Sequence, residues 1–293
     1  YTMCSISGLS GLQPTIDAIK FSKTIAIANK ESIICGWNLI KKELDRHKTE
    51  FIPVDSEHFS IWYTLKNNNF VEKIVLTASG GPFNKFPISK FKKIKIFEAL
   101  NHPNWKMGKK ITIDSSTMMN KVFEIIEAKK IFNIDYKNLS ILIHPNSYVH
   151  AIVKFKDGVI QIIAHDTDMK IPIHNTLYSD KKKSIRTKKI NIKKLNNLDF
   201  QKINKKKFPL VNILNYIPRN HSLFETILVS ANDEFVSLFL NKNIKFNDIS
   251  KNLLKFIKKK EFIKYKRISP SSIDDILRIN NYVKSEINSK FTI

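Results

Sequence analysis

The sequence predicts an α/β fold that ends in a helical region. Segments with helical and strand-like periodicity alternate up to about residue 55, an order typical of parallel sheets. A second alternating stretch continues to about residue 178 and ends in a pair of strands. After about residue 205 only helical periodicity remains.

The first unit has the order helix, strand, helix, strand. We expect these elements over residues 12–21, 24–28, 32–47 and 50–54. No GxGxxG turn follows a first strand and the chain begins with Tyr1, so we expect the front of this unit to be missing from the sequence. The 293 residues, 42% of them hydrophobic, suffice for about two domains with a buried core.

The second unit mixes helices with strands. We expect helices near 58–67, 89–100 and 115–131, a loop over 101–114, and strands near 73–78, 140–144, 149–156 and 159–164. Lys and Asn then replace apolar residues over 179–205, which indicates a linker. The chain closes with helices predicted near 209–216, 221–241, 248–259 and 271–288. The resulting domain boundaries are 1–55, 56–178 and 206–293.

The net charge of +24 comes mainly from Lys, and most of the excess lies after residue 150. Because few Arg or aromatic residues accompany the Lys runs, a solvated surface explains them better than a nucleic-acid interface. No apolar run has the roughly 18 to 20 residues that a membrane span needs. Cys4 and Cys35 form no CxxC pair, so we expect a reducing compartment, the cytoplasm or a plastid-type space.

Two carboxylates follow an apolar segment and stand two residues apart. If that segment is a strand that reaches Asp55, then Asp55 and Glu57 lie on one face, roughly 6.5 Å apart along the chain. Such a pair suits the oxygen ligands of a divalent metal. A polar strand end with an alternating outer face is the alternative.

The last helix predicted for the second unit carries a polar stripe. Ser115 and Ser116 can cap its N-terminus, where backbone amides would accept an anion such as phosphate. Asn120, Lys121 and Glu124 stand three or four residues apart on one face. A surface Lys–Glu pair is the alternative. Much of the remaining helix surface is apolar, through Met118, Met119, Val122, Phe123 and Ile126. A buried polar stripe is costly unless it is used, which favours the functional interpretation.

Two loops supply further candidates. Trp105 lies in a polar loop, where it either closes over a ligand and expels water or anchors the loop to the core. Ser79 is followed by two glycines, where the backbone either approaches a ligand closely or makes a plain turn.

Six sequence motifs, in their order and spacing, resemble those of the 1-deoxy-D-xylulose 5-phosphate reductoisomerase family. The motifs are ANKES (28–32), PVDSEH (53–58), TASGGPF (77–83), NHPNWKMGKKITIDSSTMMNK (101–121), HPNSYVHAIVKFKDG (144–158) and DMKIPI (168–173). The resemblance spans nearly the whole chain, dense over 24–173 and weaker beyond. It implies that residues 1–55 are the C-terminal part of a Rossmann-like NADPH-binding domain, that 56–178 form the catalytic domain and that 206–293 form the C-terminal helical domain.

The resemblance implies an enzyme of isoprenoid precursor synthesis that isomerises deoxyxylulose phosphate and reduces the product with NADPH to methylerythritol phosphate. It implies a requirement for Mg²⁺ or Mn²⁺, with Asp55, Glu57 and Glu124 as ligands. It also implies a homodimer for the full-length enzyme. From charge and hydropathy we expect no nucleic acid and no membrane as partners.

The remaining site residues are carried over by motif. The substrate-binding set is Lys30, Ser56, Glu57, Ser79, His102, Ser115, Asn120, Lys121 and Glu124, and the catalytic set within it is Lys30, Glu57, Lys121 and Glu124. The positions near the cofactor are Asn29, Glu31 and Gly108. The flap residues are Trp105 and Met107, and His150 and Met169 line the pocket nearby.

The sequence departs from the family pattern at a few positions. Thr167 replaces the Pro that usually precedes the Asp-Met pair. In the helical domain, Val229 and Asp233 depart from the NAANE motif of the family. The segment YSDKKK stands where the family usually has a Trp-Pro pair. Because no cofactor turn is present, a non-catalytic remnant that binds metal and phosphosugar is the alternative function. A basic nucleic-acid-binding protein is a third hypothesis.

Overall fold

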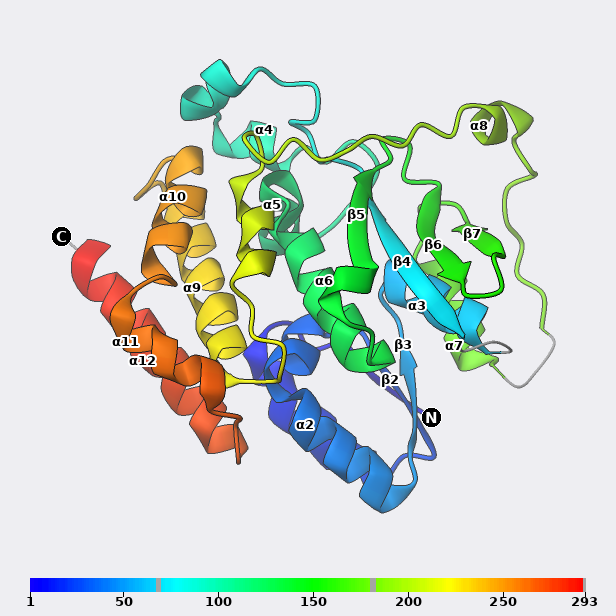
Figure 1. Cartoon of the computed structure of the whole chain (residues 1–293), viewed down its shortest axis with the longest axis horizontal. Helices are drawn as coiled ribbons and strands as arrows, with labels where there is room; N and C mark the ends of the chain where they lie inside the picture. The colour runs from blue at the N-terminus through cyan, green and yellow to red at the C-terminus, as the bar shows by residue number, and fades with distance from the viewer. Residues whose placement is uncertain (67–69, 180–182, 292–293) are drawn as a thin grey trace.

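The computed structural model describes residues 1–66, 70–179 and 183–291. The fold combines two sheets with a helical region (Figure 1). The first sheet is parallel, in the order β1-β2-β3. Its elements are β1 (Thr2–Cys4), η1 (Leu9–Gly11), α1 (Leu12–Ile19), β2 (Thr24–Ile27), α2 (Lys30–His47) and β3 (Glu50–Pro53).

Helix α2 begins at a cap that the sequence supplies. The Asn29 side chain accepts a hydrogen bond from the Ser32 backbone N–H at 2.9 Å, so the helix begins at Lys30, two residues before the predicted start. Lys30 is thereby placed just beyond the carboxyl end of β2. In parallel α/β sheets, this edge is where ligands bind.

The second sheet is mixed and has the order β5-β4-β6-β7. Its strands are β4 (Val71–Ala78), β5 (Leu139–Ile143), β6 (Val149–Phe155) and β7 (Ile160–Ala164). Strand β4 pairs parallel with β5 and antiparallel with β6, and β7 pairs antiparallel with β6 at the outer edge. Helix α3 (Ser56–Leu65) packs against β6.

Helix α6 (Met119–Phe132) joins the two halves of the molecule. Its residues Met119, Phe123 and Ile126 belong to a core shared with the first unit and the C-terminal helices, whereas Ile125 and Ala128 belong to the core under the second sheet. A helix that is apolar on two sides is buried, so its polar stripe is buried with it. The neighbouring elements are η2 (Ile88–Lys93), α4 (Ile96–Leu100), α5 (Lys109–Thr117), η3 (Tyr136–Asn138) and α7 (Lys170–Leu177).

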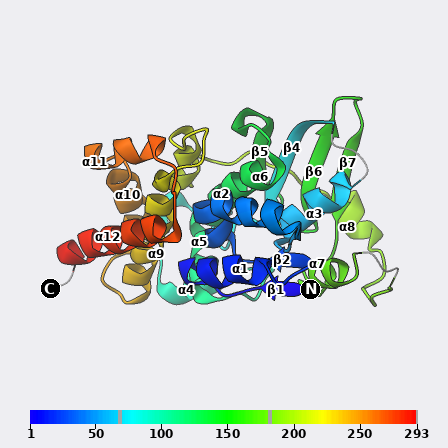
Figure 2. The ribbon, with the colours of Figure 1, turned by 90° about the horizontal axis from the view of Figure 1, so that it is seen from below.

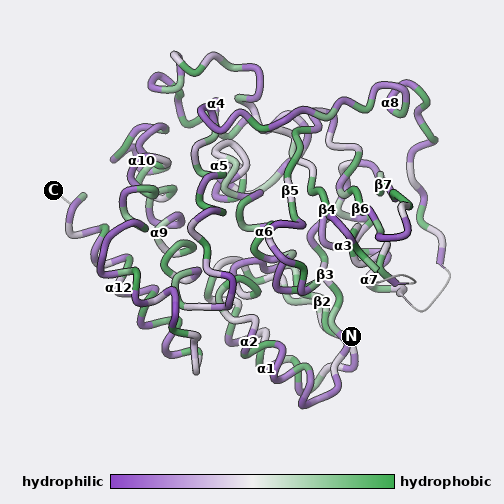
Figure 3. Tube along the Cα trace, viewed as in Figure 1, coloured by the Kyte–Doolittle hydropathy of each residue, from purple (hydrophilic) through white to green (hydrophobic). Residues whose placement is uncertain are grey.

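The C-terminal region is helical and centred on α9. Its elements are α8 (Ile192–Asn196), η4 (Pro209–Asn215), α9 (Leu223–Leu240), α10 (Phe246–Phe256), α11 (Lys260–Ile263), η5 (Lys264–Arg267) and α12 (Ile273–Phe291). Figures 1 and 2 place α9 to α12 at one end and the second sheet at the other, with α2 and α6 between them. In Figure 3 hydrophobic colour dominates β2 and alternates with hydrophilic colour along α12. Within the described residues, no helix is both long and apolar enough to cross a membrane.

The predicted α/β class with a helical end is confirmed, but several predicted elements are wrong. The predicted loop 101–114 ends early, because α5 begins at Lys109 after Gly108, and Met118 in the left-handed conformation (φ 66°) separates α5 from α6. The strand predicted over 50–54 ends at Pro53. Strand β1 and helices α7 and α8 were not predicted. Residues 180–182 of the predicted linker, residue 67 of a predicted helix, and residues 292–293 lie outside the described residues.

Candidate active site

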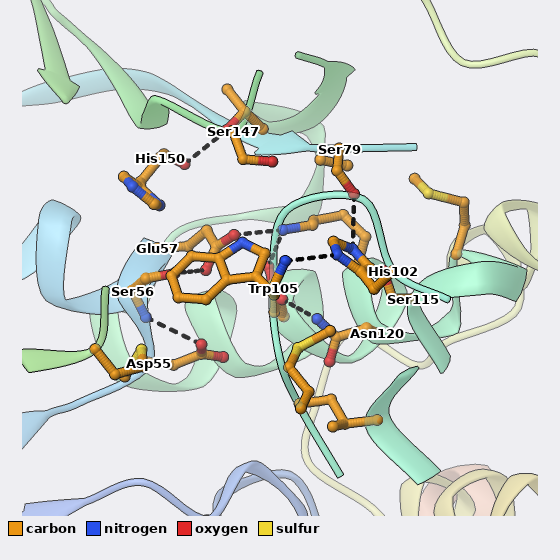
Figure 4. A pocket seen from close by; sticks show the side chains of 18 of the residues that line it. Asp55, Ser56, Glu57, Ser79, His102, Trp105, Ser115, Asn120, Ser147 and His150 are labelled. Atoms are coloured by element: carbon orange, nitrogen blue, oxygen red, sulfur yellow. Dashed lines mark hydrogen bonds and ion pairs between the residues drawn. The ribbon is translucent and has the colours of Figure 1, made fainter. Parts of the chain in front are cut away.

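A cavity of about 250 Å³ lies where the ends of β3 and β4, the flap (residues 101–108) and helix α6 meet (Figure 4). Most of the residues singled out from the sequence line this one cavity. They are Lys30, Asp55, Ser56, Glu57, Ser79, His102, Trp105, Met107, Ser115, Asn120, Lys121, Glu124, His150 and Met169.

Three carboxylates converge at the cavity floor. Asp55, Glu57 and Glu124 each offer an oxygen atom, and these atoms all lie within 4.8 Å of one another. Asp55 and Glu57 converge for a different reason from the predicted one. The strand has ended, and Asp55 caps α3 by accepting a hydrogen bond from the Ser56 N–H (3.0 Å), with Glu57 in the first helical turn.

Two lysine ammoniums lie among these carboxylates, and we call the five residues the pocket cluster. Lys30 Nζ lies 2.8 Å from Asp55 Oδ2 and 3.7 Å from Glu124 Oε1. Lys121 Nζ lies 2.7 Å from Glu57 Oε1 and 2.5 Å from Glu124 Oε2. The predicted stripe on α6 is therefore present, with Asn120 bonded to both Glu124 and Lys30.

Protonation in the pocket cluster follows from its surplus of carboxylates. Burial and the neighbouring Glu57 raise the pKa of Glu124 to about 8. Burial alone would raise the pKa of Asp55, but the ammonium of Lys30 outweighs it and lowers that pKa. Burial would lower the pKa of Lys121, but Glu124 and Glu57 raise it. The cluster thus holds one more carboxyl group than its two lysines can pair with.

The fit to a metal is supported by an incompletely satisfied oxygen atom. Glu124 Oε2 is buried and has no partner with hydrogen-bond geometry, although it forms an ion pair with Lys121. Three converging carboxylate oxygens with one such atom form a donor set that suits Mg²⁺ or Mn²⁺.

A second converging group was missed by the sequence analysis. His58 Nδ1 lies 3.4 Å from Glu127 Oε2 and 3.7 Å from Asp55 Oδ2, and His58 Nε2 bonds the Glu124 backbone carbonyl at 2.9 Å. Burial would lower the pKa of His58, but Glu127 and Asp55 raise it to about 9. His58, a residue of α3, therefore links α3 to α6 next to Asp55 and Glu124. Its position three residues after Asp55, one helical turn, was the available signal.

Ser79 and His102 form a polar corner at the opposite wall. His102 Nδ1 accepts hydrogen bonds from the N–H groups of Asn104 (3.2 Å) and Trp105 (3.0 Å), so the proton of the neutral ring is on Nε2. That proton is donated to Ser79 Oγ (3.1 Å), which also accepts from the Gly81 N–H (3.0 Å). Burial and Lys121 lower the pKa of His102 to about 4, which keeps the ring neutral. The Ser79 hydroxyl proton is left to donate to an anion.

The glycines after Ser79 are required by the fold of this corner. Gly81 has φ +61°, and a Cβ there would approach Ser115 O to 3.0 Å. The turn therefore brings β4 against α5, close to Ser115.

The predicted capping role of Ser115 and Ser116 is wrong. Both lie inside α5, and the single proton of the Ser116 hydroxyl is shared between the carbonyls of Ala99 (2.6 Å) and Thr112 (2.8 Å). The physical reason is that α5 begins earlier, at Lys109 after the N-cap residue Gly108, and ends only at Met118. Ser115 still lines the cavity, at the end of α5, and no side chain caps the first turn of α6.

The flap lies over the cavity. Asn104 Nδ2 donates to Pro145 O (2.7 Å) and to Ser147 Oγ (2.8 Å), which ties the flap to the loop before β6. The Trp105 indole meets the His150 ring edge-on, with centroids 6.2 Å apart. Because Trp105 is partly exposed and lines the cavity, its geometry favours a lid over a core anchor.

The three positions predicted near the cofactor lie outside this cavity. The Asn29 side chain caps α2 and donates to the carbonyls of Ile6 and Gly8, and Glu31 pairs with Lys110 at 2.6 Å. Gly108 faces open space, since a Cβ there would meet nothing within 4 Å.

Lys110 is the centre of another charged group that the sequence analysis did not find. Its ammonium contacts Glu31 of α2, Asp114 of α5 (3.0 Å) and Asp233 of α9 (3.0 Å). Asp114 also accepts a hydrogen bond from Asn232 at 2.8 Å. We call Lys110 and these three carboxylates the Lys110 cluster. It ties the helix after the flap to both neighbouring units.

Sequence comparison covers most of the chain. Residues 1–36 match a family described as 1-deoxy-D-xylulose 5-phosphate reductoisomerase, and residues 51–132 match the C-terminal domain of that enzyme. Residues 165–286 match a third family, described as DXP reductoisomerase C-terminal domain.

Individual proteins give the same result. The chain is 61% identical over 291 residues to 1-deoxy-D-xylulose 5-phosphate reductoisomerase of Pelagibacter ubique, covering 99% of this chain and 75% of that protein. The enzyme of the same name from a Sulfurihydrogenibium species is 40% identical, with 94% of this chain and 72% of that protein covered.

Solved structures agree with the sequences. A DOX-P reductoisomerase in complex with NADPH, fosmidomycin and magnesium superposes with a TM-score of 0.91 at 31% identity, covering 99% of this chain and 75% of that one. The Zymomonas mobilis enzyme in complex with NADPH gives 0.87 at 33% identity, with 99% and 74% covered. The chain belongs to the 1-deoxy-D-xylulose 5-phosphate reductoisomerase family.

Proposed function

We propose that this pocket isomerises 1-deoxy-D-xylulose 5-phosphate and reduces the product with NADPH to 2-C-methyl-D-erythritol 4-phosphate, a step of non-mevalonate isoprenoid precursor synthesis. The observation that carries the proposal is the convergence of Asp55, Glu57 and Glu124 beside a cavity with an anion-binding corner. The volume of about 250 Å³ is below the roughly 300 to 1,000 Å³ of drug-sized sites, which suits a small phosphosugar.

Asp55, Glu57 and Glu124 would hold Mg²⁺ or Mn²⁺. When bound, the ion supplies Lewis-acid stabilisation of negative charge on the substrate oxygens. Lys30 and Lys121 would donate to substrate hydroxyls, since both ammoniums lie beside these carboxylates and both residues line the cavity. Ser56, which donates to Glu57 at 2.5 Å, would hold that carboxylate and touch the reacting carbons.

The phosphate end of the substrate would lie at the opposite wall. Ser79 and Ser115 offer hydroxyls there, Asn120 an amide, and Lys121 a positive charge. His102 orients the Ser79 hydroxyl through the Nε2 hydrogen bond. Since Lys121 pairs with Glu57 at 2.7 Å and its charge also acts on His102, it would fix the distance between the two ends of the substrate.

NADPH supplies the hydride when bound. Asn29, Glu31 and Gly108 remain the predicted positions near it, and the open space beside Gly108 supports that position most directly. The side chains of Asn29 and Glu31 would act by shaping the first turn of α2, because both are held in internal contacts. The names of relatives that match 94 to 99% of the chain support an enzyme over a non-catalytic remnant.

The enzyme's assembly is proposed as a homodimer through β7. This strand pairs with β6 on one side only among the described strands, and it carries the exposed side chains of Ile160 and Ile162, with the exposed Val159 just before it. A second copy would cover this edge and bury these side chains. We expect a dimer mass by light scattering, and a monomer for the double variant Ile160→Lys/Ile162→Lys. The control Ile190→Lys, at a still more exposed position outside β7, is expected to stay dimeric, and a monomeric parent chain would refute the proposal.

The test of the proposed activity is calorimetric binding of deoxyxylulose phosphate with and without Mg²⁺, together with NADPH oxidation. We expect saturable binding that requires the metal and is lost in Glu57→Gln. The control Glu72→Gln changes an exposed carboxylate on β4 and should bind like the parent. A folded chain that binds no substrate with Mg²⁺ present would contradict the proposal.

A further inference from the structure

Four aromatic rings form a continuous column from helix α3 to the flap. Phe59 meets His165 at 6.3 Å, His165 stacks on His150 at 3.7 Å with planes 15° apart, and His150 meets Trp105 at 6.2 Å. His150 lines the cavity and Trp105 covers it, whereas His165 lies behind them, after β7. We call these four residues the aromatic column.

Hydrogen bonds fix the orientation of both imidazoles. His150 Nε2 faces the His165 backbone carbonyl at 3.2 Å, so it carries the proton and donates it. His165 Nδ1 faces the Asp166 carbonyl at 2.8 Å and carries the proton of that ring. Burial lowers the pKa of both rings, that of His150 to about 3, so the stacked pair is neutral. The His150 ring is held both through its face and through one nitrogen.

The other nitrogen of His165 indicates that this ring acts through its position and not through a hydrogen bond of that nitrogen. His165 Nε2 is buried and has no hydrogen-bond partner among the described residues, a state that costs free energy and that an apolar side chain would avoid. What the ring provides is a flat surface against His150. The edge-to-face contact that Trp105 makes with His150 depends on the plane that this surface sets.

We propose that His165 is a positioning residue for the flap: it holds His150 at the angle against which the Trp105 indole closes over the substrate. The identity of the substrate in this inference rests on the proposed function. The positioning role of His165 rests on the aromatic column alone. Closure acts equally on bound substrate and transition state, so its loss raises KM and leaves kcat nearly unchanged.

The test compares three substitutions of His165. His165→Ala removes the stacking surface and should raise the KM for deoxyxylulose phosphate about 3- to 10-fold, the range expected for one aromatic contact. His165→Phe keeps a flat ring and should restore the parent KM. His165→Asn introduces a polar side chain without a ring, and it should raise the KM as His165→Ala does. If His165→Ala does not fold, His165→Asn replaces it in the test. His47→Ala, on the partly exposed end of α2, controls for loss of a histidine.

A second measurement needs no turnover. In a Trp37→Phe/Trp62→Phe background, acrylamide quenching of Trp105 fluorescence reports how far the flap opens without ligand. We expect about 2-fold stronger quenching in His165→Ala or His165→Asn and parent-like quenching in His165→Phe. Unchanged quenching and unchanged KM in the Ala and Asn variants would overturn the inference. A parent chain without turnover would refute the proposed function instead, and the quenching result would still decide the role of His165.

Discussion

The pocket cluster and the Lys110 cluster are built from the same parts. Each sets three carboxylates around lysine, with two ammoniums in the pocket cluster and one in the Lys110 cluster. Each has a carboxyl group whose pKa is raised by burial, Glu124 to about 8 and Asp233 to about 6. The ratio of carboxylates to ammoniums is higher in the Lys110 cluster, so an excess of acid alone would favour the Lys110 cluster as the metal site.

They differ in where the carboxylate oxygens point. In the pocket cluster they converge within 4.8 Å of one another beside a cavity, with the lysines at the sides. In the Lys110 cluster the ammonium occupies the centre, and among the described residues its carboxylates form no such convergent group. The difference teaches that convergence of oxygens, and not an excess of acid, marks a metal site. The Lys110 cluster instead joins α2, α5 and α9.

Glu124→Gln should produce the largest effect. Loss of one converging oxygen should lower kcat/KM by about 1,000-fold, because metal stabilisation of the transition state is worth several kcal/mol. Stability should be unchanged or higher, since a buried carboxyl with a raised pKa is removed. Steady-state kinetics and thermal unfolding measure the two quantities. Activity within a few-fold of the parent would show that Glu124 is no ligand.

Lys110→Met should show the opposite pattern. The substitution leaves three carboxylates without their shared ammonium, so the free energy of unfolding measured in urea should fall by about 2 kcal/mol. This loss is smaller than that for a fully buried ion pair because the Lys110 ammonium is partly exposed. Metal affinity should stay within a few-fold. Lys110→Arg, which keeps the charge, is the matched control. If the Met variant lost the metal and kept its stability, the distinction between the two clusters would fail.

Asp233 should give the smallest effect, a change in pH dependence. Its folded-state pKa of about 6 exceeds the usual value of 3.8, so the folded protein binds the proton more tightly than the unfolded chain. Its contribution to stability is therefore full below about pH 4 and falls as pH rises through about 6. The parent should lose about 1 kcal/mol relative to Asp233→Asn between these values, measured by urea unfolding across pH. Parallel curves would mean that Asp233 titrates normally.

The sequence predicted the contents of the pocket far better than their geometry. Asn120, Lys121 and Glu124 were placed correctly because spacings of three and four residues define one helix face. Asp55 and Glu57 were paired correctly but on the wrong element, since the chain turns into α3 after Pro53. The start of α5 and the break at Met118 depend on single backbone angles that periodicity does not encode.

Contacts distant in sequence could not be predicted. Lys110 is 79 residues from Glu31 and over a hundred from Asp233, and nothing in any one segment indicates that they meet. The stack of His150 on His165 depends on the register of β6 against β7. Such contacts follow from how the elements pack, so a single sequence does not contain a local signal for them.

The most direct test of the metal site is a Mn²⁺ titration followed by electron paramagnetic resonance. It would use the parent chain, Glu124→Gln and Asp233→Asn, each shown by circular dichroism to be folded. The account predicts one saturable Mn²⁺ per parent chain, the same in Asp233→Asn, and loss of this binding in Glu124→Gln. Binding that survives Glu124→Gln, or disappears only in Asp233→Asn, would contradict it.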